Sequence, residues 1–238
     1  MKILLTNDDG IEAEGIRALA LWARKLGEVT VIAPRYEQSG KSHAIEFTKP
    51  FEIRRVDFCG LEAWSVDSTP ADCVRFGFMG LKVRYDLVLS GINRGVNLGQ
   101  DIVYSGTVGA IFEAYRMQSS GIAISTYPDT LEHAVARLDQ VFDYFSENKL
   151  LELNPLYNVN IPKDPSGIRI TKQGSPYFSD EFCKIGADLY MQSGHKLEDC
   201  CPEDAYRDTV ATESGYISIT PLCGSRTNLP LFEKLNGF

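Results

Sequence analysis

The chain has 238 residues, of which 44% are hydrophobic and 24% charged, and its net charge is −8. That length and apolar content suffice for one substantial core and fall within the range of a single large domain. The acidic balance argues against binding duplex nucleic acid through its phosphates, which needs a basic surface, but it allows a small anionic ligand at one local site.

The first two thirds of the chain alternate predicted strands and helices. Apolar runs predict strands at 2–6, 28–34, 51–56, 62–66, 85–91, 121–126 and 156–162. Helical spacing predicts helices at 11–27, 70–80, 107–118 and 131–145, the last with Asp129 and Thr130 as its N-terminal cap. This alternation predicts an α/β fold whose parallel sheet is covered on both faces, with ligands bound beyond the carboxyl ends of the strands.

The last third has a different character, because helical periodicity fades from about residue 167. Strands are predicted at 167–174 and 215–222, separated by a polar, irregular segment at 173–212 that is typical of an extension or hairpin. Residues 229–238 predict a short amphipathic helix that packs on a neighbour. We expect a core at 1–166 and an extension with core-completing strands at 167–238, within one domain overall.

Two adjacent acids, Asp8 and Asp9, follow the first predicted strand and stand directly before Gly10. Keeping both ionised in a half-buried crevice is costly unless a cation compensates them. A divalent ion that prefers hard oxygen ligands, Mg²⁺ or Mn²⁺, is the natural compensator. Alternatively, one acid caps the following helix and the other is solvated.

A long glycine-rich loop, SGINRGVNLGQDIVYSGTVG, follows the strand at 85–91. Its glycines let backbone N–H groups approach an anion, and Asn93 can offer an amide oxygen to a metal. Ser105 to Thr107 open the next helix, whose N-terminus attracts phosphate. The loop is neither a Walker loop nor a dinucleotide fingerprint, and no base stands beside its serine for a hydrolase triad. A flexible surface loop is the alternative, although loops of this length are more often functional.

Ser39 and Gly40 follow the second strand at the same edge of the sheet as Asp8, where an ordinary turn is the alternative interpretation. His43 is close to Ser39 in the sequence and is a candidate to contact a phosphate or leaving group. His133 lies on the long helix and is expected to be structural or solvated. The histidines do not cluster, which disfavours a zinc hydrolase.

The six cysteines contain no C-x-x-C pair, so free thiols are expected, with Cys200 and Cys201 exposed in a polar loop. No secretory signal is expected, because the first apolar stretch runs directly into acids. No stretch approaches the roughly 20 apolar residues of a membrane span. We expect a cytoplasmic protein without a membrane partner.

Seven stretches occur in the order seen in one known family: LLTNDDGIEAEGI, VIAPRYEQSGKS, VDSTPADCV, LVLSGINRGVNLGQDIVYSGTVGA, NVNIP, ITKQG and GYISITPL. By these motifs the chain resembles the SurE family of stationary-phase survival proteins, which act as metal-dependent nucleotidases. The resemblance covers nearly the whole chain, and its first and fourth motifs are highly specific.

The resemblance implies hydrolysis of nucleoside 5′- and 3′-monophosphates, with short polyphosphate as a further substrate. It implies one Mg²⁺ or Mn²⁺ held by Asp8, Asp9, Ser39 and Asn93, with the two aspartates also catalytic. The phosphate would lie near Gly40, Asn97, Ser105, Gly106 and Thr107. The implied fold is a Rossmann-like three-layer sandwich with a mostly parallel sheet, plus a smaller C-terminal β extension used to assemble a homodimer or homotetramer.

The sequence also allows two other functions. One is a haloacid-dehalogenase-like phosphatase with Asp8 as covalent nucleophile, although that chemistry usually needs Asp-x-Asp-x-Thr after the strand and NDDGI does not supply it. The other is a nucleotide- or phosphate-sensing module that binds without turnover. Release of phosphate from AMP separates an enzyme from such a sensor.

Overall fold

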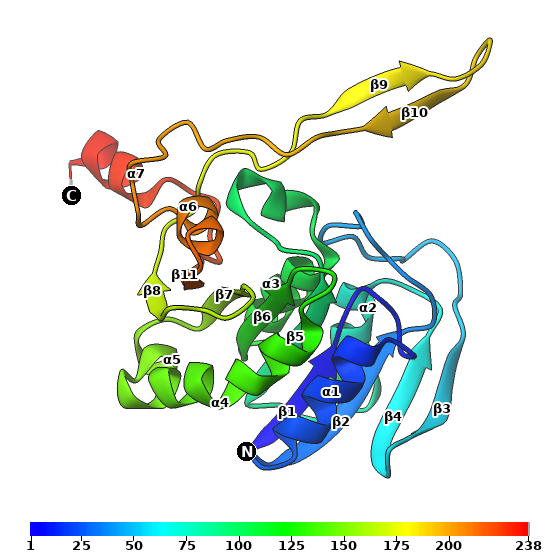
Figure 1. Ribbon diagram of the computed structural model, residues 1–238. Helices are drawn as coiled ribbons and strands as arrows, with labels where there is room; N and C mark the ends of the chain where they lie inside the picture. Colours follow the sequence, from blue (N-terminus) through cyan, green and yellow to red (C-terminus); the bar gives the residue numbers. More distant parts are fainter. Residues whose placement is uncertain (238) are drawn as a thin grey trace.

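A computed structural model describes residues 1–237, whose strands form one nine-stranded sheet and a separate two-stranded hairpin (Figure 1). The strands of the large sheet are β1 (Lys2–Thr6), β2 (Glu28–Pro34), β3 (Ile53–Phe58), β4 (Leu61–Val66), β5 (Leu87–Arg94), β6 (Ser120–Thr126), β7 (Leu156–Ile161), β8 (Ile168–Ile170) and β11 (Ile217–Pro221). Their order across the sheet is β3-β4-β2-β1-β5-β6-β7-β11-β8.

The middle of the sheet is parallel. Strands β4, β2, β1, β5, β6 and β7 each run parallel to their neighbours in that series. At the two margins, β3 pairs antiparallel with β4, and β11 pairs antiparallel with β7. The predicted α/β fold with a mostly parallel sheet is therefore confirmed, and the carboxyl ends of β1, β2, β5 and β6 meet at one edge.

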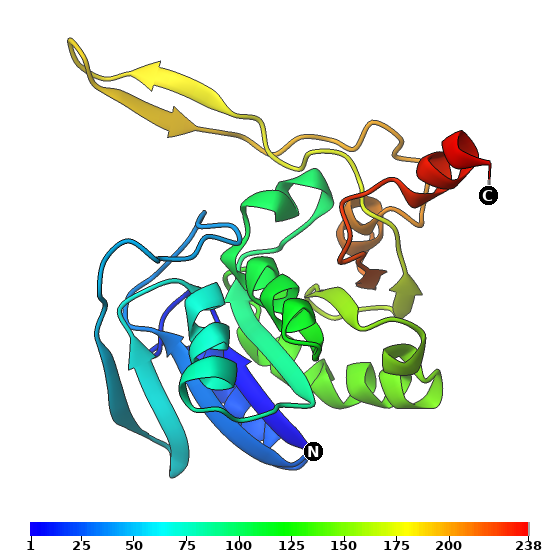
Figure 2. The ribbon, with the colours of Figure 1, turned by 180° about the vertical axis from the view of Figure 1, so that it is seen from behind.

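Helices cover both faces of the sheet and make three layers. On the face seen in Figure 1 lie α1 (Glu14–Ala23) and α4 (Leu131–Glu147), with α5 (Leu150–Leu153) at the end of α4. On the opposite face, seen in Figure 2, lie α2 (Pro70–Arg75) and α3 (Gly106–Arg116). Side chains of β1 alternate between the two layers. Ile3 and Leu5 pack with α1 and α4, whereas Leu4 packs with α2 and α3.

The last third of the chain both extends the sheet and leaves it. Strands β8 and β11 join the large sheet, and α6 (Asp208–Glu213) precedes β11. Between them, β9 (Glu181–Lys184) and β10 (Tyr190–Ser193) form the antiparallel hairpin that projects away from the body in Figures 1 and 2. The predicted C-terminal helix is α7 (Leu229–Asn236), which has no buried residue. The boundary between 166 and 167 stays a prediction.

Three local predictions need correction or refinement. Helix α1 begins at Glu14 rather than at residue 11, because the N–H of Ile11 donates to Pro34 O and Ala13 closes a turn onto Gly10. Helix α2 ends at Arg75 and continues as a π-helical turn at Phe76–Gly80. Thr130 occupies the predicted N-cap position of α4, but its hydroxyl donates to Tyr127 O and accepts no helix N–H.

Two expectations about the whole chain can also be compared with the structure. All six cysteines are free thiols, as expected. Among residues 1–237, none of the helices is both long enough and apolar enough to cross a bilayer.

Gly15 lets α1 lie directly against β5, because a Cβ at this position would be 2.0 Å from the carbonyl oxygen of Ile92. We expect Gly15→Ala to lower the free energy of unfolding by about 1–3 kcal/mol, since helix and strand must separate. Urea unfolding measures this change. The matched control is Gly167→Ala, whose added Cβ meets only Tyr216 ring carbons at 3.8 Å. Equal stability of the two variants would contradict the close packing.

Candidate active site

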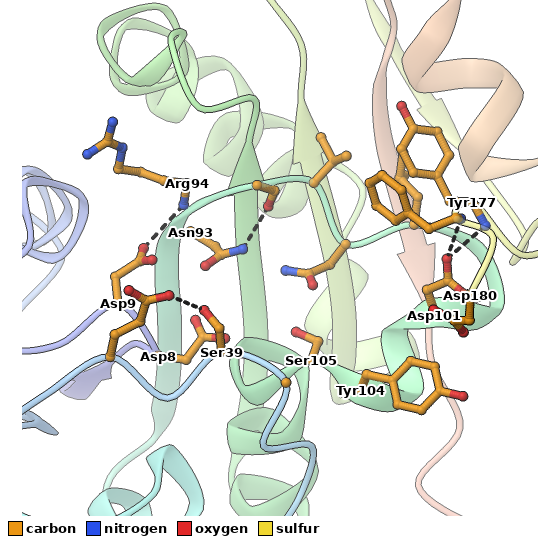
Figure 3. A pocket seen from close by; sticks show the side chains of 17 residues that line it. Asp8, Asp9, Ser39, Asn93, Arg94, Asp101, Tyr104, Ser105, Tyr177 and Asp180 are labelled. Atoms are coloured by element: carbon orange, nitrogen blue, oxygen red, sulfur yellow. Dashed lines mark hydrogen bonds between the residues drawn. The ribbon is translucent and has the colours of Figure 1, made fainter. Parts of the chain in front are cut away.

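A cavity of about 420 Å³ opens where the carboxyl ends of β1 and β5 meet the loops that follow β2 and β5 (Figure 3). It is lined by Asp8, Asp9, Glu37, Ser39, Gly40, Asn93, Arg94, Gly95, Val96, Asn97, Leu98, Asp101, Tyr104, Ser105, Tyr177, Phe178 and Asp180. The cavity therefore lies where ligands are expected in an open α/β sheet.

A tight turn after β1 directs the two aspartates into this cavity. The side-chain amide of Asn7 donates to Gly10 O at 2.8 Å, and Gly10 adopts a φ of +99° that other residues rarely reach. The N–H of Gln38 donates to Asp8 O at 2.7 Å, which ties the loop after β2 to the same turn.

Asp8 is almost completely buried and is held by the start of α3. The Thr107 hydroxyl donates to Asp8 Oδ1 at 2.6 Å, and the Thr107 N–H donates to Oδ2 at 3.2 Å. A Cβ at Gly106 would lie 2.9 Å from Asp8 Cβ, so only glycine allows this approach. Burial, reinforced by the charge of Asp9, raises the pKa of Asp8 to about 6 against the opposing Thr107 hydrogen bonds.

Asp9 is more open and lies next to the end of β5. Its Oδ2 accepts the backbone N–H of Arg94 at 3.2 Å. Burial raises the pKa of Asp9, and the charge of Glu37 adds to the rise, while Arg94 opposes it. Two neighbouring carboxyl groups thus both resist ionisation here, which is the electrostatic situation that a bound cation would relieve.

The four side chains predicted as metal ligands, Asp8, Asp9, Ser39 and Asn93, line the cavity together. The side-chain nitrogen of Asn93 donates to Gly95 O at 2.7 Å, so its oxygen faces Asp9 and Ser39 (Figure 3). The Ser39 hydroxyl donates to Glu37 at 2.6 Å, which leaves its oxygen lone pairs available. All four offer oxygen, the donor that Mg²⁺ and Mn²⁺ prefer, so the residues fit such an ion.

The predicted donor set combines the Ser39 hydroxyl and the Asn93 amide with the two aspartates. Among residues 1–237, no three His, Cys, Asp or Glu side chains gather as a metal site.

The residues predicted around the phosphate divide into two groups. Gly40, Asn97 and Ser105 line the cavity, whereas Gly106 and Thr107 lie behind Asp8. Both donors of Thr107 bind Asp8, so in this structure they support the carboxylate rather than an open anion site. The Ser105 hydroxyl caps α3 by accepting the N–H of Val108 at 3.1 Å.

Asn97 is fixed by polar side chains at the ends of β6 and β7. Its side-chain nitrogen donates to Ser125 Oγ at 2.8 Å, and its backbone N–H donates to Asn160 Oδ1 at 2.8 Å. Its carbonyl oxygen accepts from the side chains of Asn158 and Asn160. These hydrogen bonds tie the glycine-rich loop to β6 and β7 at Asn97.

His43 does not line the cavity, contrary to the suggestion that it reaches a phosphate. Its Nε2 lies 2.8 Å from Oε2 of the buried Glu113, which also pairs with Arg75 at 3.0 Å. His133 pairs with Asp164 on the surface, in keeping with the structural or solvated role expected for it.

Aromatic residues that sequence reasoning did not single out form the far wall of the cavity. Tyr104 and Phe178 are 57% and 48% exposed, and Tyr177 lies buried beside them. Asp101 Oδ2 accepts the backbone N–H groups of Tyr177 and Phe178, each at 2.8 Å. This joins the 3₁₀-helix Gly99–Tyr104 to a segment more than seventy residues later.

Asp208, at the start of α6, is a second anchor of this wall. The buried carboxylate accepts the N–H groups of Gly99 at 3.2 Å, Gly174 at 2.7 Å and Thr209 at 2.8 Å. Asp208 lies outside the quoted motifs, in the polar segment 173–212, so no signal in the sequence indicated its role.

The charge lining the cavity is strongly negative. Arg94 is the one basic residue in the described lining. Five acids face it: Asp8, Asp9, Glu37, Asp101 and Asp180. A phosphate group entering this cavity without a cation would meet net repulsion.

Comparison with known proteins gives a consistent result. Residues 3–180 match the family model described as Survival protein SurE. A 5′-nucleotidase SurE of Legionella pneumophila strain Philadelphia 1 is 36% identical over 99% of this chain and 96% of its own length. The protein of the same name from Thermoanaerobacter sp. strain X514 is 37% identical over 100% and 98%. The crystal structure of a SurE protein from Aquifex aeolicus superposes with a TM-score of 0.83 at 32% identity, covering 100% of this chain and 99% of that one.

Asp208 predicts a pH dependence of stability. Burial raises its pKa from 3.8 to about 6, although the N–H groups of Gly174, Gly99 and Thr209 oppose the rise. Because the folded chain holds this proton more tightly than the unfolded chain, the stabilising contribution is complete below the unfolded value and is lost as pH rises through the folded value.

We therefore expect wild-type protein to lose about 3 kcal/mol of unfolding free energy relative to Asp208→Asn between about pH 3 and about pH 7.5. Urea unfolding of both proteins at each pH measures it. Asp143→Asn, an exposed substitution on α4, is the control and should track wild type. A wild-type curve parallel to that of Asp208→Asn would contradict the raised pKa.

Proposed function

The chain belongs to the SurE family, and from that premise we propose that this cavity removes phosphate from nucleoside 5′-monophosphates with the help of a divalent cation. The relatives named 5′-nucleotidase support a phosphoric monoester hydrolase that acts on nucleotides. Metal dependence, the choice of Mg²⁺ or Mn²⁺ and the roles of individual residues are part of the proposal.

One observation carries the metal dependence: five acids and a single arginine line the cavity that a phosphate would enter. A dication held by Asp8, Asp9, Ser39 and Asn93 would balance the two aspartates and place a positive charge next to the phosphoryl oxygens. When bound, it would act as a Lewis acid on the phosphoryl oxygens. The oxygen-only donor set and the raised pKa values of the two aspartates support this position.

The chain's own residues divide the remaining work. Asp8 is held at both oxygens by Thr107, so its position is preset. Asp9, whose hydrogen bond in the described structure involves Oδ2, has Oδ1 available to accept a proton from an attacking water. Gly40, Asn97 and Ser105 face the cavity as hydrogen-bonding partners for phosphate oxygens, and donors already in place stabilise the transition state most effectively.

The aromatic wall supports a nucleoside rather than a small phosphate ester as substrate. Tyr104 and Phe178 present exposed rings at the same cavity as the acids. Any nucleobase has a face that can stack on such rings, which suits a site that accepts several bases.

The haloacid-dehalogenase-like alternative is disfavoured by the sequence after β1. That chemistry usually needs Asp-x-Asp-x-Thr, and NDDGI does not supply it. Hydrolysis of 3′-monophosphates and short polyphosphate, cytoplasmic location and assembly into a homodimer or homotetramer stay proposals. Exposed apolar side chains on the hairpin and on α7 support assembly through the last third of the chain.

Release of phosphate from AMP in the presence of Mn²⁺ tests the function, since a sensing module would bind without turnover. We expect Asp9→Asn to lower kcat by at least about 100-fold while circular dichroism stays unchanged, because ligand and proton acceptor are lost together. The control is Asp180→Asn, which changes an exposed acid of the cavity that is outside the proposed ligand set. Its kcat should remain within about fivefold of the wild-type value. Near-normal turnover by a folded Asp9→Asn protein would refute the assignment.

Removing the ring of Tyr104 tests nucleoside recognition separately from phosphate chemistry. We expect Tyr104→Ala to raise KM for AMP by about tenfold through loss of base stacking. KM for p-nitrophenyl phosphate should stay within about twofold. Tyr104→Phe keeps the ring and should resemble wild type for both substrates. An equal loss on the two substrates would show that Tyr104 does not contact the base.

A further inference from the structure

Two neighbouring cysteines lie in the segment between β10 and α6. The sulfur atoms of Cys200 and Cys201 are 3.8 Å apart, and Cys200 is exposed to solvent. The Arg207 guanidinium donates to Cys200 Sγ at 3.6 Å. Cys200 is therefore a thiol that oxidants can reach and that has a guanidinium group within hydrogen-bonding distance.

The backbone of this pair is bound to a buried carboxylate, Asp199. Asp199 accepts the N–H of Cys201 at 2.9 Å, the N–H of Ser175 at 3.0 Å and the hydroxyl of Thr209. It also forms an ion pair with Arg207 Nε at 2.7 Å. These partners hold the pKa of Asp199 well below its usual range, against the effect of burial. The N–H of Cys200 donates to Ser175 Oγ at 3.2 Å, so both cysteines are joined to Ser175.

Ser175 begins the segment that forms the aromatic wall of the active-site cavity. Two residues further on, Tyr177 and Phe178 donate their N–H groups to Asp101 and line the cavity. Tyr177 also lines a second cavity of about 410 Å³, whose lining includes Asp199 and Pro202. The cysteine pair and the proposed nucleoside site therefore share one continuous hydrogen-bonded wall.

We propose that Cys200 and Cys201 form a reversible oxidation site, at which a peroxide converts the pair to a disulfide and thereby displaces the Tyr177–Phe178 wall of the nucleotide cavity. The effect on substrate binding rests on the function proposed above, whereas disulfide formation and movement of the wall do not.

The chemistry balances with one equivalent of hydrogen peroxide. The Cys200 thiolate attacks a peroxide oxygen, the O–O bond breaks, and hydroxide leaves while Cys200 becomes a sulfenic acid. The sulfur of Cys201 then attacks Cys200 Sγ, the S–O bond breaks, and the second oxygen leaves as water. Two electrons pass from the thiols to the peroxide, and the two thiol protons end in two molecules of water.

Ring closure requires the backbone to move. The sulfur atoms must approach from 3.8 Å to about 2.05 Å. The resulting ring contains the peptide bond between the two residues, and its N–H is the group that Cys201 donates to Asp199. Adjacent Cα atoms are only about 3.8 Å apart, less than disulfides usually span, so the bridge is strained and readily reduced. Strain at this peptide would be relieved if the hydrogen bonds from the N–H groups of Cys201 and Ser175 to Asp199 were broken.

The first experiment follows the covalent change without reference to activity. The full-length protein is treated with hydrogen peroxide, its remaining thiols are alkylated, and it is digested with trypsin. The peptide 197–207 contains both cysteines and no others. We expect this peptide to be unalkylated and lighter than the reduced peptide by two hydrogen atoms. After treatment with dithiothreitol, both cysteines should be alkylated. In the oxidised protein, amide hydrogen exchange at Tyr177 and Phe178 should be faster. An alkylated peptide or unchanged exchange at these amides would overturn the proposal.

The second experiment measures the consequence for the site. In oxidised wild type, KM for AMP should rise at least about fivefold through loss of stacking, while p-nitrophenyl phosphate turnover stays within about twofold. Cys200→Ser and Cys201→Ser should match reduced wild type before and after peroxide. Cys183→Ser removes another exposed thiol and should remain as sensitive as wild type.

Equal inhibition of wild type and the Cys200→Ser and Cys201→Ser variants would overturn the proposal, because another group would then be responsible. A reduced protein that releases no phosphate would instead refute the proposed nucleotidase function, and the mass and exchange measurements would still decide the oxidation site.

Discussion

The placement of two adjacent carboxyl groups at the buried end of β1 is the constraint on which the site depends. Asp8 is enclosed and Asp9 lies beside it, and burial raises the pKa of each. Three further acids line the same cavity and one arginine opposes them. Such an arrangement is costly to the folded chain and is retained by proteins where it serves a ligand. The proposed dication would give both acids a partner and would offer a phosphate group a positive charge beside them.

The surrounding structure keeps these acids in place through contacts distant in sequence. Gly106 allows α3 to approach Asp8, and Thr107 uses both of its donors to orient that carboxylate. On the far side, Asp101 and Asp208 bind backbone N–H groups of the segment around Gly174 and Tyr177. The edge of the sheet that carries Asp8 and Asp9 is thus connected to the start of the C-terminal extension. A change in the extension can therefore reach the aromatic wall of the cavity without touching these acids.

Local patterns in the sequence predicted the sheet, its helices and the acids at its edge, because strand periodicity and the NDDG turn are encoded by neighbouring residues. The ligand set came from the family resemblance, and its four members do line one cavity. Other features depend on pairing across the fold. Thr107 supports Asp8, and His43 pairs with Glu113. The cavity wall that contains Tyr177 comes from residues just after the ITKQG motif, which by themselves indicated no site. Nothing in the local sequence of these residues specifies their partners, since tertiary packing brings the partners together.

The most direct test of the account is the affinity of AMP for wild-type protein with and without a divalent cation, measured by equilibrium dialysis before turnover is significant. We predict that AMP binds at least about tenfold more weakly in excess EDTA, because its phosphate then faces uncompensated acids. Added Mn²⁺ should restore the affinity for AMP. In Asp9→Asn, Mn²⁺ should restore much less. Equal affinity for AMP in EDTA and in Mn²⁺ would contradict the claim that a cation makes this cavity a phosphate site.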